Sequence, residues 1–209
     1  MLQPFGGMAL AEFLINNIIY MYVTLTPVIL AGILNMIWVK LPVMKFAAKP
    51  VDFGKNFTDG RRIFGDNKTW KGIIGYVIFN TVFTVLWGFI CSAANIESLD
   101  YFYMGHENTI AFNLIIGVLL GLGYSLAELP NSFLKRRFDI KPGKTISGFM
   151  KIFFIFLDQA DSVFGVALVV WFFYDLGILL YLLYVLVGAA THLLLNMLLY
   201  FMKLRKNMF

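Results

Sequence analysis

The 209-residue sequence contains one cysteine, Cys91, and two histidines, His106 and His192. A lone cysteine excludes a disulfide framework within the chain and a thiolate cluster for zinc or iron. The two histidines are too far apart in the sequence for a zinc-ligand motif. Covalent catalysis by a Ser–His or Cys–His pair is therefore not indicated, and His192, which falls in an apolar stretch, is expected to be a packed bundle residue.

Charge is also scarce. Charged residues make up 14% of the chain, whereas 60% is hydrophobic and 17% aromatic. Soluble domains carry roughly 25% charged residues, so this composition predicts an integral membrane protein. About 20 apolar residues are needed for one helical span. Five segments meet this requirement: 15–38, 73–94, 110–126, 152–173 and 178–202. The predicted fold is an all-α integral membrane protein, a bundle of about five transmembrane helices that forms a single domain over residues 1–209.

Lysine and arginine are missing from the segment before the first span and from the loops after the second and fourth spans. All 17 of them lie in three regions, 40–71, 135–151 and 203–206. Basic loops remain cytoplasmic in multi-pass proteins. The five spans therefore predict a plasma-membrane protein with its N-terminus outside and its C-terminus in the cytoplasm. The predicted outer side carries only acids: Glu12, Glu97, Asp100, Glu107 and Asp175.

The net charge of +5 follows from this distribution. A cationic cytoplasmic face is expected to attract anionic membrane lipids. A separate basic domain is not indicated, so no nucleic-acid partner is expected. The two predicted cytoplasmic loops, about 41–72 and 129–150, are the polar stretches long enough to build a site.

Two aspartates, Asp158 and Asp161, interrupt the otherwise apolar stretch 149–174. A carboxylate at membrane depth costs a few kcal/mol on insertion scales and usually has a function. Residues three apart share one face of a helix, so both side chains can converge on one cation. Mg²⁺ suits such oxygen ligands, and Gln159 and Ser162 are weaker candidates beside them. The alternative is a structural ion pair with a neighbouring span.

The second basic region begins with the block ELPNSFLKRR at 128–137 and continues with Lys141 and Lys144. Arginine binds phosphate through two hydrogen bonds and lysine binds it as a point charge. Beside a carboxylate pair, this run predicts a clamp for a triphosphate, although such a run can also serve only to orient the protein. Glu128 is a candidate third metal ligand, or an acid at a helix end without a function.

The first loop ends in the block GDNKTWKG at 65–72. A glycine-containing turn that leads into a helix can hold a phosphate on its backbone N–H groups. Lys68 and Lys71 add positive charge. The spacing differs from that of a Walker A loop, and Asp66 is alternatively a plain N-cap.

These blocks, with KPGK at 141–144 and DQADS at 158–162, resemble the archaeal CDP-archaeol synthase family, relatives of phosphatidate cytidylyltransferase. The resemblance runs through most of the chain. It implies an enzyme, a CTP-dependent cytidylyltransferase of phospholipid biosynthesis. With Mg²⁺ as cofactor, such an enzyme transfers CMP from CTP to a membrane lipid phosphate and gives a CDP-lipid and pyrophosphate.

The resemblance also assigns residues. It implies Asp158 and Asp161 as metal ligands and catalytic residues. Further residues in the matching blocks are expected to contact the phosphates of CTP or of the lipid: Lys135 and Arg136 as catalytic residues, and Lys68, Thr69, Asn131, Ser132, Arg137, Lys141 and Lys144 as substrate-binding residues. The Pro-Gly-His-Gly-Gly run of the broader cytidylyltransferase signature is missing before Asp158, which leaves open how the nucleotide is held.

Two other functions are compatible with a membrane-embedded acid pair. A CDP-alcohol phosphotransferase carries D-G-x2-A-R, but here Asp59-Gly60 is followed by Arg61-Arg62-Ile63-Phe64, so that motif is absent. A small cation-coupled transporter would use the acids to bind the transported ion. However, the sequence shows no inverted pair of broken helices. The lipid, the number of metal ions and the oligomeric state stay open.

Overall fold

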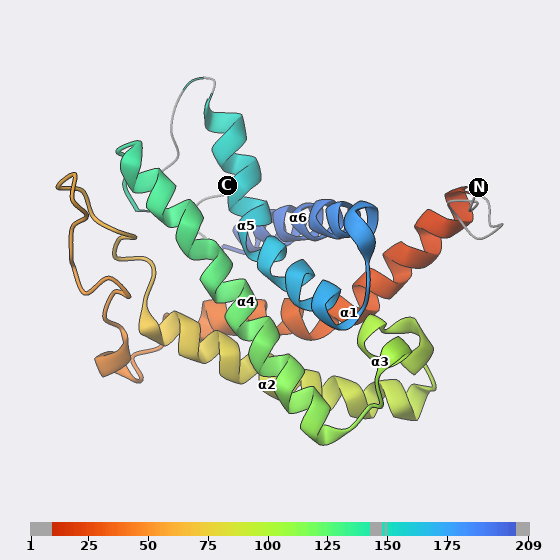
Figure 1. The fold of residues 1–209 in the computed structure, drawn as a ribbon. Coiled ribbons are helices and arrows are strands. Elements are labelled where there is room, and N and C mark those ends of the chain that lie inside the picture. The colour runs from red at the N-terminus through yellow and green to blue at the C-terminus, as the bar shows by residue number, and fades with distance from the viewer. Residues whose placement is uncertain (1–9, 143–147, 149, 204–209) are drawn as a thin grey trace.

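The computed structural model describes residues 10–142, 148 and 150–203 of the chain. Over these residues, five long helices form a bundle (Figure 1). They are α1 (Leu10–Trp38), α2 (Trp70–Ala94), α4 (Ile110–Arg137), α5 (Met150–Phe173) and α6 (Gly177–Phe201). Each is long and apolar enough to cross a membrane. No strand occurs in the described part of the chain, so the predicted class, an all-α integral membrane protein, is confirmed.

Short elements connect the long helices. The 3-10 helix η1 (Lys45–Ala47) lies in the first loop, residues 39–69, and η2 (Glu97–Leu99) and α3 (Tyr101–Gly105) lie between α2 and α4. Threonine side chains begin two of the long helices, because each accepts a hydrogen bond from a first-turn N–H that has no partner within the helix. Thr69 accepts from Gly72 and Thr109 accepts from Phe112, both at 3.2 Å.

The end of α4 differs from the sequence prediction. The span was expected to end at residue 126 and a loop to begin at 129, but the helix continues through Pro130 to Arg137. Proline usually breaks helices, yet a bundle accommodates it where neighbouring helices satisfy the backbone. Here Asn131 and Ser132, which follow Pro130, are buried, so packing holds this segment in place. The basic run therefore lies on a helix and not in a loop.

Glycines let neighbouring helices approach closely. A Cβ on Gly165 of α5 would lie 2.0 Å from the carbonyl oxygen of Gly123 in α4, and a Cβ on Gly117 of α4 would lie 2.5 Å from the Cα of Thr81 in α2. Small residues at such contacts are typical of membrane bundles. The pairs α1–α2, α2–α4, α4–α5 and α5–α6 pack extensively, whereas α1 and α6 contact each other sparsely.

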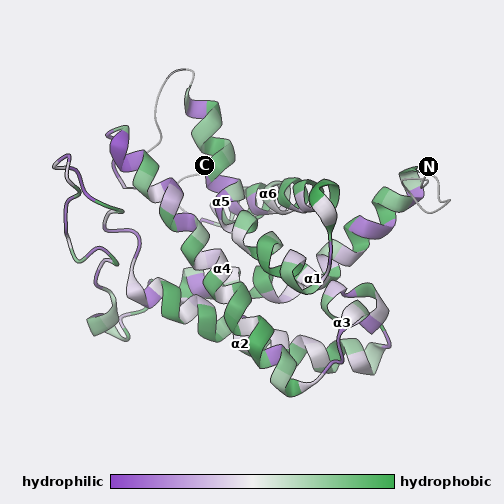
Figure 2. Ribbon diagram, in the orientation of Figure 1, coloured by the Kyte–Doolittle hydropathy of each residue, from purple (hydrophilic) through white to green (hydrophobic). Residues whose placement is uncertain are grey.

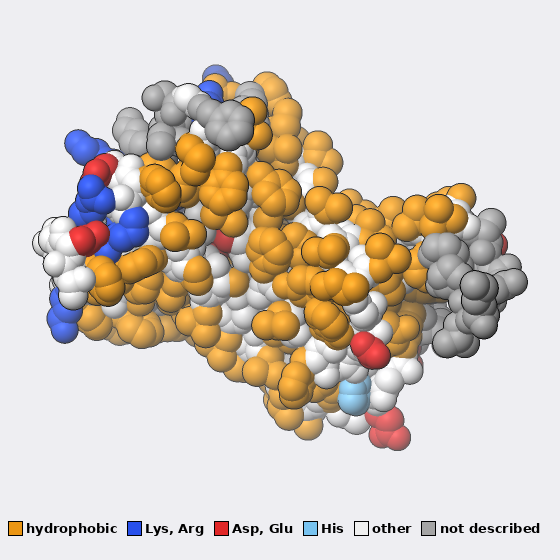
Figure 3. All heavy atoms as spheres, turned by 45° about the horizontal axis from the view of Figure 1, so that its top comes forward, with side chains coloured by type: hydrophobic (Ala, Val, Ile, Leu, Met, Phe, Trp, Pro, Cys, Tyr) orange, Lys and Arg blue, Asp and Glu red, His pale blue; other side chains and the backbone are white. Residues whose placement is uncertain are grey.

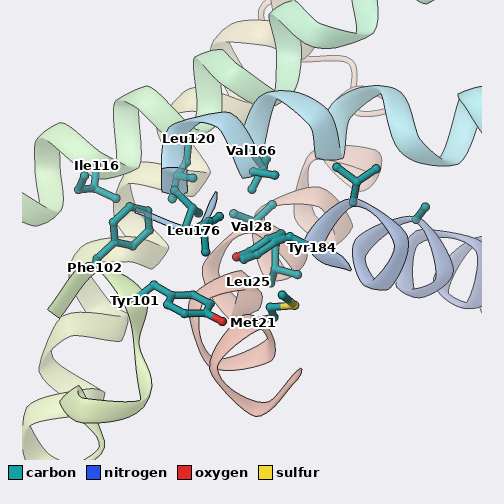
Figure 4. Packing of buried hydrophobic residues seen from close by; sticks show 14 of the residues in the cluster. Met21, Leu25, Val28, Tyr101, Phe102, Ile116, Leu120, Val166, Leu176 and Tyr184 are labelled. Carbon is teal, nitrogen blue, oxygen red and sulfur yellow. The ribbon is translucent and has the colours of Figure 1, made fainter. Parts of the chain in front are cut away.

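One half of the bundle is filled by an apolar core. Tyr101 of α3 lies among side chains from α1, α4, α5 and α6, including the buried Leu25, Leu120 and Tyr184 (Figure 4). The Tyr101 hydroxyl donates to Asn17 Oδ1 of α1 at 2.7 Å. This core closes the end of the bundle at α3, so space for a ligand remains at the other end.

The two ends of the bundle differ in charge. Figure 2 shows hydrophobic residues along the long helices and hydrophilic residues in the first loop. On the face seen in Figure 3, Lys and Arg side chains gather over the first loop and the end of α4, away from the end that carries α3. We call the end of the bundle that carries the first loop and the end of α4 the basic end. The distribution agrees with the loops predicted from the sequence, and the orientation in a membrane stays a prediction.

Candidate functional site

A cavity of about 620 Å³ opens between α1, α4, α5, α6 and the first loop. Its volume lies within the roughly 300–1,000 Å³ of typical small-molecule sites. Side chains of α1 and α6, including Val28, Ile33 and Leu195, give it an apolar wall. Nine residues that the sequence predicted as site residues also line it: Lys68, Glu128, Asn131, Ser132, Lys135, Arg136, Lys141, Asp158 and Asp161.

The close contact between α4 and α5 brings these residues together. The two helices run in opposite directions and touch at Gly123 and Gly165. Eight residues after Gly123, α4 presents Asn131, and seven residues before Gly165, α5 presents Asp158. The glycine contact therefore sets the register that places an amide of one helix opposite the acids of the other.

The two aspartates meet at this amide. Asn131 Nδ2 donates to Asp158 Oδ1 at 2.8 Å and to Asp161 Oδ2 at 2.7 Å. Lys135 Nζ pairs with the other oxygen of Asp158. The backbone N–H of Ser162 donates to Asp161 Oδ1 at 2.7 Å. Since Asp161 is only 8% exposed, its charge depends on these few neighbours.

Two buried oxygens beside the aspartates have no hydrogen-bond partner among the described residues. They are Asn131 Oδ1 and Ser162 Oγ, and both residues line the cavity. Carboxylate, amide and hydroxyl oxygens are the donors that Mg²⁺ takes in proteins. The set formed by Asp158, Asp161, Asn131 and Ser162 therefore fits a hard divalent cation.

Glu128, the third predicted metal ligand, lines the same cavity as the two aspartates. It forms an ion pair with Lys68 of the first loop, and within the described chain no group of three His, Cys, Asp or Glu residues gathers as in a metal centre. Burial alone would lower the pKa of Lys68, but the carboxylates of Glu128, Asp161 and Asp158 outweigh burial and raise that pKa. Lys68 is therefore cationic at neutral pH and neutralises Glu128 before any ligand binds.

Positive charge slightly exceeds negative charge in the cavity. Four cations, Lys68, Lys135, Arg136 and Lys141, face three carboxylates there. Arg136 Nε is buried and has no hydrogen-bond partner among the described residues. A buried guanidinium N–H without an acceptor is costly, and an anionic ligand would supply that acceptor.

Other predicted residues lie outside the cavity. Thr69 caps α2, so the alternative in which Asp66 is the N-cap is wrong; Asp66 pairs with Arg62 at 2.7 Å. Lys71 is buried and donates to the carbonyl oxygen of Leu41 at 2.6 Å. Lys144 lies outside the described residues.

Arg137 also turns away from the cavity. Its guanidinium lies over the rings of Phe133 and Phe57, with centroids at 4.5 and 5.2 Å. It pairs with Asp59 at 3.1 Å and donates to the carbonyl oxygen of Arg62 at 2.5 Å. We call this group the loop latch, because it fastens the first loop to α4. The structure thus places Arg137 in a loop contact and not among the cavity cations.

Replacing Arg137 by Gln should loosen the first loop. Cation–π contacts and partly exposed ion pairs contribute roughly 0.5–1 kcal/mol each, so amide exchange over residues 57–62 should accelerate about tenfold. Hydrogen exchange followed by mass spectrometry measures this. Arg137→Lys keeps the charge but loses the planar fork, and should recover only part of the protection. Unchanged exchange in the Gln variant would contradict the latch.

The buried carboxylate of Asp52 organises the backbone of the first loop. Asp52 pairs with Arg62 at 2.7 Å and accepts the backbone N–H groups of Gly54, Phe64 and Gly65 at 2.9–3.0 Å. Burial alone would raise the pKa of Asp52, but the Arg62 guanidinium and these N–H donors hold that pKa well below its usual range. Phe64 thereby reaches the cavity wall.

This carboxylate should make the loop resistant to mild acid. Because the folded pKa of Asp52 is lower than the unfolded value of about 3.9, its contribution is complete above that value and is lost as the pH falls further. Exchange at Phe64 and Gly65, corrected for the intrinsic rate, should therefore stay constant between about pH 8 and 5. Asp52→Asn should raise the exchange rate at both residues over this whole pH range. Loosening of the wild-type loop near neutral pH would disprove this account.

The sequence missed the contribution of α6. His192, expected to be packed, is half-buried and lines the cavity, with Nδ1 3.2 Å from the carbonyl oxygen of Gln159. Asn196 lines it as well, and its Nδ2 donates to Gln159 Oε1 at 2.7 Å. A signal was present, because polar residues four apart in an apolar span share one helix face.

The fold and the site together define a multi-pass membrane protein with a charged cavity suited to a phosphate-bearing ligand and a divalent cation. Residues 14–209 match the family model described as CarS-like: CDP-archaeol synthase. The chain therefore belongs to the CDP-archaeol synthase family, and the resemblance inferred from its motifs is confirmed.

Several curated relatives are named CDP-archaeol synthase. The chain is 38% identical to the Pyrococcus furiosus protein over 49% of this chain and 53% of the relative, and 36% identical to the Thermococcus onnurineus protein over 54% and 60%. It is 31% identical to the Thermofilum pendens protein over 74% of this chain and 65% of the relative. The chain thus spans about half to two thirds of the length of these relatives.

A solved structure has the same fold. It is described as an intramembrane enzyme for archaeal membrane lipids biosynthesis and matches with a TM-score of 0.56. The match covers 84% of this chain and 92% of that chain at 22% identity. This likeness supports the arrangement of the helices.

Proposed function

We propose that this protein is a cytidylyltransferase that transfers CMP from CTP to a membrane lipid phosphate. The observation that carries the proposal is one cavity that joins an oxygen-rich acid pair, four cations and an apolar wall. These three parts match the three chemical parts of the reactants: a bound divalent cation, phosphates and a lipid. Family membership supports the same reaction.

Asp158 and Asp161, with Asn131 Oδ1 and Ser162 Oγ, would hold Mg²⁺. Bound there, the ion would reduce the negative charge of the triphosphate and polarise its phosphorus centres. Lys135 pairs with Asp158, and with that carboxylate holding the cation, Lys135 would be placed to bind a phosphate of the nucleotide.

The cations bring two anionic reactants together. Arg136, whose Nε has no acceptor within the described chain, and Lys141 suit the phosphates of CTP. A lipid phosphate oxygen then forms a bond to the α-phosphorus as the bond to the β-phosphate breaks and pyrophosphate leaves. The phosphate oxygen is already anionic, so the protein need only align the groups and stabilise the leaving charge.

The apolar wall suits the lipid. α1 contributes Leu25, Ile29 and Ile33, and α6 contributes Leu195 and Leu199. Because α1 and α6 contact each other sparsely, lipid chains can lie along this wall while the phosphate reaches the cations. The basic end then faces the cytoplasm of the cell, where CTP is available, and the N-terminus lies outside.

The proposal is tested by incubating the purified protein in nanodiscs with CTP, Mg²⁺ and ether- or ester-linked lipid phosphates. We expect CDP-lipid and equimolar pyrophosphate, detected by mass spectrometry and a coupled assay, with at least one lipid class. ATP and GTP serve as nucleotide controls. Absence of CDP-lipid with every lipid would refute the proposal, and CTP-independent ion flux into liposomes would favour a transporter instead.

A further inference from the structure

The first part of the first loop, residues 39–51, combines exposed apolar side chains with lysines. Phe46 in η1 is 72% exposed, and exposed apolar side chains that lie together mark protein or membrane interaction sites. The segment contains three exposed lysines, Lys40, Lys45 and Lys49, and neither Asp nor Glu. The apolar side chains that it exposes are Val39, Leu41, Val43 and Phe46.

Both ends of this segment are fastened to the ends of spanning helices. At one end, the backbone N–H of Leu41 donates to the carbonyl oxygen of Trp38 in α1 at 3.1 Å, and Lys71 of α2 binds the Leu41 carbonyl at 2.6 Å. At the other end, the N–H of Trp70 donates to the carbonyl oxygen of Lys49 at 3.1 Å. The segment therefore stays beside the ends of α1 and α2.

This attachment limits how far Phe46 can move from the membrane. Phe46 follows Leu41 by five residues and precedes Lys49 by three, so its Cα lies within about 11 Å of the Lys49 anchor. Figure 1 shows η1, the short orange helix, near the start of α2, whereas the middle of the first loop extends away from α2 before returning to it. Phe53 adds a second exposed ring, 62% exposed and 6.3 Å from the ring of Trp70.

We propose that residues 39–51 form an interfacial anchor in the leaflet at the basic end of the bundle, with Phe46 among the upper acyl chains and the lysines on anionic headgroups. An aromatic side chain gains free energy by leaving water, and lysines near the surface reach anionic headgroups. The anchor continues the membrane-embedded surface of α1 and α2. It also holds the first loop, which supplies Phe64, Asn67 and Lys68 to the cavity, at headgroup level.

The depth of Phe46 tests this proposal independently of catalysis. Cys91 is the sole cysteine of the chain and is fully buried, so Cys91→Ala with Phe46→Cys carries one nitroxide label. The labelled chain is placed in nanodiscs of phosphatidylcholine, with and without phosphatidylglycerol. We expect the label to collide with oxygen more than with a water-soluble nickel complex, as measured by electron paramagnetic resonance. A label on Thr58→Cys, at an exposed turn of the same loop, should show the reverse.

Charge removal tests the lysines. Lys45→Gln and Lys49→Gln should each lower the ratio of inserted to solvated label about fivefold in nanodiscs that contain phosphatidylglycerol, because each lysine contributes about 1 kcal/mol there. Without phosphatidylglycerol, the ratio should not change. Equal nickel accessibility at positions 46 and 58 overturns the anchor. If the ratio of inserted to solvated label is the same with and without phosphatidylglycerol, and is unchanged by the lysine substitutions, the role assigned to the headgroups is wrong.

Discussion

Replacing Asp161 by Asn should lower the rate of the proposed CMP transfer by about a thousandfold or more, because the cavity loses one of two carboxylates that fit a divalent cation. The substitution keeps the size of the side chain but removes its charge. The Asn131 amide and the Ser162 N–H would then face a neutral group instead of a carboxylate. Steady-state formation of pyrophosphate from CTP and lipid phosphate measures the loss, and Asp158→Asn should behave alike.

The matched control is Asp175→Asn. Asp175 is an exposed acid at the far end of α5, where its carboxylate accepts from Trp171 Nε1 at 3.2 Å. This variant should keep full activity. Thermal unfolding in detergent separates chemistry from folding, and Asp161→Asn should remain folded. Full activity of both cavity variants would disprove the roles assigned to the acid pair.

The spanning helices were predictable from the sequence because a helix needs about 20 apolar residues to cross the bilayer. The predicted ends at residues 38, 94 and 173 coincide with those of α1, α2 and α5. The end of α4 was not predictable, since a local rule treats Pro130 as a boundary. What overrides that rule is the burial of Asn131 and Ser132, which depends on a helix later in the chain.

The site was partly predictable for a similar reason. Asp158 and Asp161 stand out in the sequence because a charge in lipid is costly. The pairing of Asn131 with them depends on the contact between Gly123 and Gly165, and the sequence does not show which of its 18 glycines make such a contact. Neighbouring residues on a helix point about 100° apart. Arg136 therefore faces the cavity and Arg137 the first loop, a difference that the run Lys-Arg-Arg alone does not show.

The second large effect is expected at Gly165, whose contact with Gly123 sets the register of the site. A Cβ there would lie 2.0 Å from the Gly123 carbonyl oxygen and 2.7 Å from the Ala127 Cβ. Neither atom is the end of a flexible side chain, so the helices must separate. Gly165→Val should destabilise the bundle by about 3 kcal/mol or more. It should also abolish activity, because Asn131 would move away from Asp158.

Gly32→Ala provides the comparison within another spanning helix. A Cβ on Gly32 has its nearest neighbour, Tyr76 Cε2, at 3.8 Å, which is an ordinary contact, and replacing Gly by Ala in a helix interior is favourable by up to about 1 kcal/mol. Unfolding in detergent, followed by circular dichroism, should therefore show little change for Gly32→Ala and a large loss for Gly165→Val. Equal stability of the two variants would mean that α4 and α5 do not touch at these glycines, and the register that joins Asn131 to the aspartates would lose its physical basis.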